Sequence, residues 1–67
     1  MKRWNTKQKK ELEVPEIDLF LEKVIELSKY HGLSIAHEDG HGNFIIQKYD
    51  RGLSDWLMEA DDAREGY

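Results

Sequence analysis

Apolar residues at helical spacing fill a long stretch of the chain between a proline and a glycine. They recur every three or four positions, at Ile17, Phe20, Leu21, Val24 and Leu27. This spacing is typical of the buried face of an α-helix. Pro15 suits the first helical turn, where its missing N–H costs no hydrogen bond, and Gly32 suits the position after the last turn. The sequence therefore predicts a helix over residues 15–31.

Two β-prone segments follow this helix, separated by the turn-forming sequence DGHG. They cover residues 33–38 and 43–49, and an Asp-Gly pair between such segments favours a hairpin. A two-residue turn at 39–40 and a four-residue loop at 39–42 both fit. Both registers place the same apolar side chains on one face, because side chains alternate along a strand. We expect this to be the core face, with Leu33, Ile35, Phe44 and Ile46.

A short helix is predicted to close the chain. Ser54 is a suitable N-cap, and Leu53 and Met58 would form a hydrophobic staple around it, so that the helix would cover residues 54–63. The predicted fold class is α+β, with a long helix, an antiparallel hairpin and a short C-terminal helix in the order α-β-β-α. A lone hairpin is marginal in water. We therefore expect an extra N-terminal strand or a second subunit to complete its edges.

The chain has 67 residues and no cysteine, and we place a single small domain at residues 13–67. A core of this size supplies only about 3–5 kcal/mol, and small domains usually need an additional source of stability. Disulfides are excluded, which leaves a tight core, a metal site of histidine and carboxylate ligands, or self-association. On the ground of size we favour a homo-oligomer.

Residues 1–12 form a basic N-terminal arm on an acidic body. The first ten residues carry five positive charges and no negative one in a chain of net charge −4, which leaves −9 for the remainder. The arm could touch phosphate, remain a frayed tail, or dock on its own acidic body. Because the body repels the phosphates that the arm would attract, we do not expect nucleic acid as a partner.

Membrane contact is not expected either. No run of apolar residues exceeds three, far below the roughly 20 that span a bilayer. The basic start is followed by ELEVPEID, and not by the apolar segment of a signal peptide. The plain expectation is a cytoplasmic protein.

The sequence HEDGHG at residues 37–42 is a candidate site as well as a turn. His37, Asp39 and His41 could supply imidazole and carboxylate ligands, but a metal site needs three or four side chains that converge on one point. Opposed strand faces and a loop tip work against that convergence, so we expect no metal and no other cofactor. The chain also lacks the nucleophile, phosphate-loop and metalloprotease motifs of common enzymes. We expect no catalytic residues and no enzymatic activity.

The segment VPEIDLFLEKVIELSKYHGLSIAHEDGHGNFIIQKYD, residues 14–50, resembles a group of short, uncharacterised proteins of bacteriophage and prophage genomes. In that group a VPEID helix is followed by HGLSI, by HEDGHG and by an apolar strand. The resemblance assigns no role to any residue. It implies an accessory, anti-defence type of protein made by a phage inside a bacterium, which binds a host protein or sequesters a signalling nucleotide.

We therefore hypothesise a non-enzymatic binding protein that modulates or counters a host process. The residues expected to contact its ligand or partner are His37, Asp39, His41, Lys48, Tyr49 and Arg51. The cations among them would hold an anionic small molecule such as a signalling nucleotide. The alternative is a protein-interaction inhibitor whose acidic C-terminal face docks on a basic nucleic-acid-binding protein of the host. That face would consist of Asp55, Glu59 and Asp62.

Overall fold

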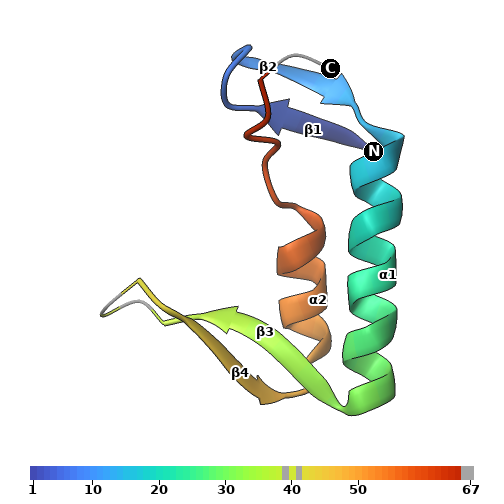
Figure 1. The fold of residues 1–67 in the computed structure, drawn as a ribbon, viewed down its shortest axis with the longest axis vertical. Coiled ribbons are helices and arrows are strands. Elements are labelled where there is room, and N and C mark those ends of the chain that lie inside the picture. Colours follow the sequence, from blue (N-terminus) through green and yellow to red (C-terminus); the bar gives the residue numbers. More distant parts are fainter. Residues whose placement is uncertain (39, 41, 66–67) are drawn as a thin grey trace.

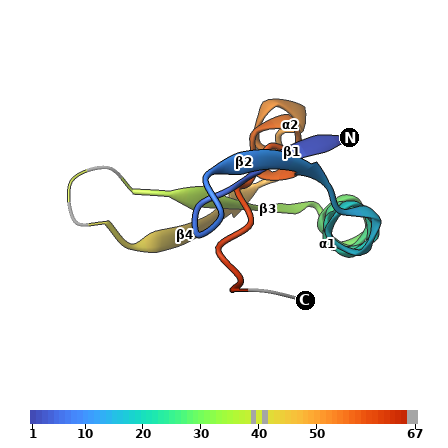
Figure 2. The same ribbon diagram turned by 90° about the horizontal axis from the view of Figure 1, so that it is seen from above.

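The computed structural model describes residues 1–38, 40 and 42–65, which form two helices and two hairpins (Figure 1). The elements in chain order are β1 (Lys2–Asn5), β2 (Lys10–Glu13), α1 (Pro15–His31), β3 (Leu33–His37), β4 (Phe44–Lys48) and α2 (Arg51–Met58). The two helices lie side by side, with the β1–β2 hairpin at one end and the β3–β4 hairpin at the other. From above, α2 lies over one side of the β3–β4 hairpin and α1 lies beside it (Figure 2). The predicted α+β class is confirmed.

Helix α1 has the predicted limits. Pro15 lies in its first turn, and Glu16 and Asp18 lie near the positive end of the helix dipole. Gly32 ends the helix with a φ of 70°, and its N–H reaches the carbonyl oxygens of Ser28 and Lys29. A residue with a Cβ would be strained at this positive φ.

The β3–β4 hairpin has the register of the predicted four-residue loop. His37 lies opposite Phe44, and the Glu38 N–H donates to the Asn43 carbonyl at 2.7 Å. Ile35 lies opposite Ile46, so the apolar side chains share one face, as predicted. Asp39 and His41 lie outside the described residues.

The prediction that this shared face is the core face is wrong. Helix α2 packs on the opposite face of the hairpin, where Ser34 and Ala36 are buried. The small side chains of Ser34 and Ala36 allow close approach, and the Ser34 hydroxyl accepts a hydrogen bond from the Asp50 N–H at 2.9 Å, just before α2 begins. The face with Phe44 and Ile46 is exposed.

The predicted limits of the last helix are also wrong. Helix α2 begins at Arg51, and its N-cap is Asp50, whose carboxylate accepts the Gly52 N–H at 2.7 Å. Ser54 is buried inside the helix. Leu53 therefore lies in the first turn and cannot form a staple from outside the helix. The helix ends at Met58 because the following residues leave it to reach the β1–β2 hairpin.

The predicted N-terminal arm lies mostly in the β1–β2 hairpin, which is docked on the rest of the chain. Asn5 is fully buried, and its side-chain oxygen accepts the N–H groups of Lys7 and Gln8 at 2.9 and 2.7 Å. Asp62 forms a parallel bridge to Asn5: its N–H donates to the Trp4 carbonyl at 2.8 Å, and its carbonyl accepts the Thr6 N–H at 2.9 Å.

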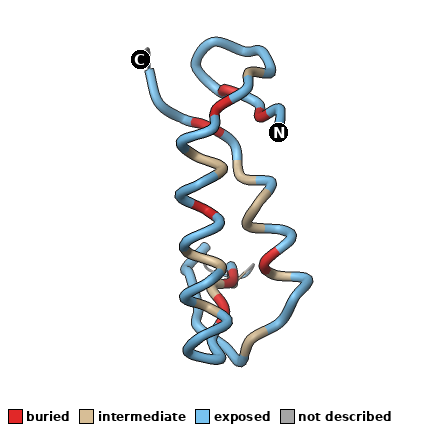
Figure 3. Tube along the Cα trace, turned by 90° about the vertical axis from the view of Figure 1, so that its right-hand side faces the viewer, coloured by how far each residue is buried: buried red, intermediate tan, exposed pale blue. Residues whose placement is uncertain are grey.

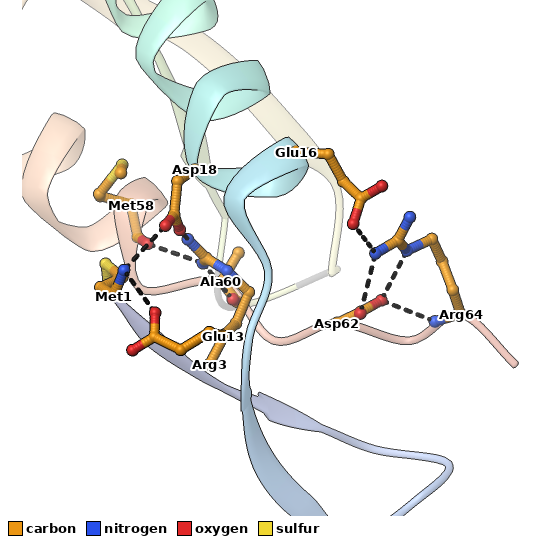
Figure 4. A network of polar contacts seen from close by, with 9 residues as sticks. All are labelled: Met1, Arg3, Glu13, Glu16, Asp18, Met58, Ala60, Asp62 and Arg64. Carbon is orange, nitrogen blue, oxygen red and sulfur yellow. Dashed lines mark hydrogen bonds and ion pairs between the residues drawn. The ribbon is translucent and has the colours of Figure 1, made fainter. Parts of the chain in front are cut away.

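A buried arginine joins three segments at this end of the molecule (Figure 4). Arg3 is 3% exposed, and its guanidinium donates to the carbonyls of Met58 and Ala60 at 2.8 and 2.6 Å and to the Asp18 carboxylate at 2.6 Å. The Met1 ammonium group also contacts Asp18, at 2.8 Å. We call these contacts the Arg3 clamp. Beside it, Arg64 pairs with Asp62.

Loss of the helix cap should destabilise the chain measurably. We expect Asp50→Ala to lower the free energy of unfolding by about 1 kcal/mol, because the Gly52 N–H loses its acceptor. Urea denaturation followed by circular dichroism measures this change. Asp61→Ala is the matched control, since it removes the same charge from an exposed position outside α2. Equal losses in the two variants would contradict the assigned cap.

The Arg3 clamp should make stability depend on pH at its acidic end. Hydrogen bonds from the Met1 ammonium and from Arg3 hold the pKa of Asp18 below its ordinary value of 3.8. This contribution is fully present above pH 3.8 and is lost as the pH falls through the lowered pKa. In urea titrations from pH 7 to pH 2, the stability difference between the wild type and Asp18→Asn should therefore shrink at the acidic end. For the control Asp61→Asn we expect a stability difference that stays constant with pH. A constant difference for Asp18→Asn as well would contradict the clamp.

Candidate interaction surface

The chain buries little of its own apolar surface. Among the described residues, the buried apolar side chains are Val14, Leu21 and Ala36. Buried positions are few and separated along the chain (Figure 3). The side chains of Asn5 and Asp62, which are polar, are as fully buried as Val14. Polar contacts hold the β1–β2 end, and a large apolar surface remains outside.

A continuous part of that exposed surface lies on one side of α1 and on the adjoining face of the β3–β4 hairpin. We call it the apolar face, and it consists of Phe20, Val24, Leu27, Leu33, Ile35, Phe44 and Ile46. Phe44 is 73% exposed, Phe20 64% and Ile46 61%. Such exposure is unusual for side chains of this size when they lie together.

The apolar face is hollowed. A depression of about 430 Å³ is lined only by apolar side chains, including Leu21 of α1 and Leu57 of α2 besides Phe20 and Phe44. A second depression of about 300 Å³ continues it toward Leu27 and shares Val24, Ile35 and Ile46 with the first. The two depressions form one continuous concave surface.

The unequal lengths of the two helices produce this surface. Seventeen residues of α1 extend about 26 Å, whereas eight residues of α2 extend about 12 Å. The apolar stripe of α1 is also wide, and α2 covers only the side that carries Leu21. The side with Phe20, Val24 and Leu27 has no covering element among the described residues.

The predicted binding residues lie at the two ends of the β3–β4 hairpin. The ring of His37 packs edge-on against Phe44, with centroids 6.0 Å apart. Lys48 lies opposite Leu33, at the other end of the strand pair. It is four residues from Phe44 along β4, which corresponds to about 13 Å. Tyr49 is half-buried beside Lys48, and Arg51 is exposed at the start of α2. The structure does not bring His37 together with Lys48 and Arg51, and Asp39 and His41 lie outside the described residues.

A separate depression lies between the hairpin and α2. It measures about 340 Å³ and is lined by Ala36, His37, Ile45, Gln47, Leu53 and Trp56. Trp56 is 44% exposed, so its indole is accessible there. Sequence reasoning missed this grouping because it took the other face of the hairpin as the core face; Leu53 and Trp56, three positions apart in α2, lie on one helix face toward the hairpin.

The predicted acidic face loses one of its three members. Asp55 and Glu59 are exposed, but Asp62 is 1% exposed. Its carboxylate accepts hydrogen bonds from the Arg64 backbone and guanidinium at 3.0 Å, and its backbone bridges to β1. Asp62 is therefore a structural residue of the β1–β2 end.

Within residues 1–38, 40 and 42–65, no group of three or more histidine and acidic side chains could hold a metal ion. None of the described helices has the length and apolar character needed to cross a bilayer.

Comparison of the chain with protein-family models, with curated proteins and with solved structures finds no match.

Proposed function

We propose that this chain is a non-enzymatic binding protein that acts by stoichiometric contact with other polypeptides, and that the apolar face is the surface which this contact buries. The observation that carries the proposal is the concave apolar lining of that face, with Phe44 and Ile46 more than half exposed. Burial of exposed apolar area is the main source of protein–protein affinity.

The character of the apolar face favours a protein over a small anion. An anionic ligand needs several cations or N–H donors around one pocket. His37 and Lys48 lie at opposite ends of the strand pair, and the larger depression has only apolar lining residues. Large aromatic and aliphatic side chains in a hollow are typical anchors of protein interfaces.

The phage resemblance of residues 14–50 supplies the proposed context. In that context the protein would work in the bacterial cytoplasm and would modulate or counter a host process. Asp55 lies in α2 and Glu59 in the turn that follows it, and both side chains are exposed. Their negative charges would add affinity for a basic host protein.

Nucleotide sequestration remains a second candidate, located at the depression between the hairpin and α2. Its support is the exposed indole of Trp56 beside Gln47 and His37. An indole can stack on a nucleobase, and an amide can read a base edge. Asp55 and Glu59 on α2 lower the affinity of this region for phosphate, which is why we rank this function second.

The first test is photo-crosslinking in the bacterial host. Phe44 is replaced by p-benzoyl-phenylalanine, which the 73% exposure of this position tolerates. We expect a covalent adduct with a polypeptide after irradiation, detected as a mass shift on a denaturing gel. Leu19 is the matched control, because it is an apolar residue of α1 that is 55% exposed and does not line either depression of the apolar face. Absence of any adduct at Phe44, or equal adducts at both positions, would overturn the proposal.

The nucleotide candidate has its own test. If the protein carries a nucleotide from the host, its native mass spectrum should show an adduct of nucleotide mass. Trp56→Ala should then remove the adduct, and Trp4→Ala should keep it, since Trp4 is equally exposed but lies in β1 at the other end of the molecule. A spectrum without an adduct in the wild type would reject this candidate.

A further inference from the structure

We propose that a second copy of this chain binds beside the apolar face, with the free edges of the two β4 strands paired antiparallel about a two-fold axis at Ile45, so that Phe44 and Ile46 of the two copies pack on each other. The inference rests on the proposed function, because it takes the apolar face to be a protein-binding surface. It adds the identity of the partner and the geometry of the contact.

The accessible surface of the chain is too large for a compact monomer. It measures 5150 Å², whereas a folded monomer of 7.9 kDa has about 4,400 Å². The excess of about 700 Å² is close to the roughly 800 Å² that each partner buries in a standard interface. One interface of ordinary size would therefore restore the usual ratio of surface to mass.

The shape of the chain leads to the same conclusion. Its radius of gyration is 13.0 Å, against about 11 Å for a compact domain of this length. The extents are 34 × 28 × 17 Å, so the molecule is a thin layer with one hollowed apolar side. A second copy joined at the β4 edge would bring the Phe44 and Ile46 side chains of both copies into contact on that side.

The outer edge of β4 offers unpaired backbone groups beside the apolar face. The sheet has the order β3-β4, and every residue of β4 is exposed. Glu38 bonds to Asn43, and Tyr49 bonds to Gly32, so the odd-numbered residues of β4 direct their N–H and C=O groups toward β3. Phe44, Ile46 and Lys48 must direct theirs outward. An exposed strand edge of this kind is a template for pairing with another strand.

The side chains select the register of that pairing. An axis at Ile45 places Phe44 opposite Ile46 of the second copy, and Lys48 opposite Gly42. Phe44 and Ile46 would then exchange both backbone hydrogen bonds with their opposite residues. An axis at Ile46 would instead place Phe44 opposite Lys48, which buries an ammonium group against an aromatic ring. Apolar cross-strand pairs favour the axis at Ile45.

The two-fold arrangement also closes the assembly. The two hairpins would form one four-stranded antiparallel sheet in the order β3-β4-β4-β3, with Phe44 and Ile46 of both copies on one face. Because the same edge and the same face are used by both copies, no further β4 edge remains for a third chain. The depression at Trp56 lies on the other face of the hairpin and stays accessible in the dimer.

The experiment uses the full chain and begins with its mass in solution. Native mass spectrometry and sedimentation equilibrium should show a dimer at micromolar concentration. Phe44→Lys should weaken dimerisation at least about 30-fold, as expected for the loss of an interface anchor. Leu19→Lys, an equally drastic change at an exposed position of α1, should leave the dimer intact. A monomeric wild type, or a dimer that Phe44→Lys does not weaken, would overturn the inference.

The absence of cysteine provides a second test, because any introduced thiol is unique in the chain. Ile45→Cys places two thiols directly across the proposed axis, where a disulfide can form. Mild oxidation should therefore link this variant into covalent dimers. Gln47→Cys lies on the same face of the same strand but about 13 Å from its counterpart in this register, and should remain unlinked. Equal linking of both variants, or linking of Gln47→Cys alone, would overturn the register.

Failure of the inference is distinguishable from failure of the proposed function. A monomeric wild type whose Phe44 photo-adduct contains a different polypeptide would overturn the dimer and retain the binding function. A monomer that gives no adduct at Phe44 would overturn both. An adduct of twice the mass of the chain would support the dimer and the use of the apolar face as a protein-binding surface, but not the proposed contact with a host protein.

Discussion

A chain of this length has too little interior to bury the apolar side chains that it contains, and the rest of the structure follows from that constraint. The shorter helix covers one side of the longer helix and one face of the hairpin, and buries Leu21 and Ala36 there. The other side of α1 and the other face of the hairpin remain open, with Phe44 and Ile46 more than half exposed. The surface that the fold leaves open is therefore the surface to which the proposed function is assigned.

The β1–β2 end is held together by polar contacts in place of an apolar core. Arg3 takes the position of a core side chain and donates to a backbone carbonyl at the end of α2, to another just after it and to Asp18 of α1, while Asp62 bridges to β1. Hydrogen bonds to a charged group contribute more than neutral ones, but a buried charge is costly if it loses its partner. This end therefore depends on polar pairing, in which the Arg3 Nε alone among the buried side-chain polar atoms of the described residues has no partner.

Local signals in the sequence were sufficient to predict α1, to predict Gly32 as its end, and to predict which side chains of the hairpin share one face. Tertiary contacts decided the remainder. The hydrophobic face of the hairpin indicated the core side, but small residues at Ser34 and Ala36 admitted α2 to the other side. Ser54 had the chemistry of an N-cap, yet Asp50 is bound to Ser34 and starts the helix earlier. The charges of residues 1–12 left a phosphate contact, a frayed tail and docking on the chain's own body as alternatives, and only the fold could reveal that Arg3 pairs with residues 55 or more positions away.

Amide hydrogen exchange along β4, measured by NMR on the intact chain, tests the central claim most directly. Ile45 and Gln47 have N–H groups that bond within the hairpin, whereas those of Phe44 and Ile46 point to the free edge. If a second copy pairs with that edge, all four amides exchange slowly, and only Phe44 and Ile46 lose protection on dilution or in Phe44→Lys. Rapid exchange of Phe44 and Ile46 at every concentration, beside slow exchange of Ile45 and Gln47, would contradict the account.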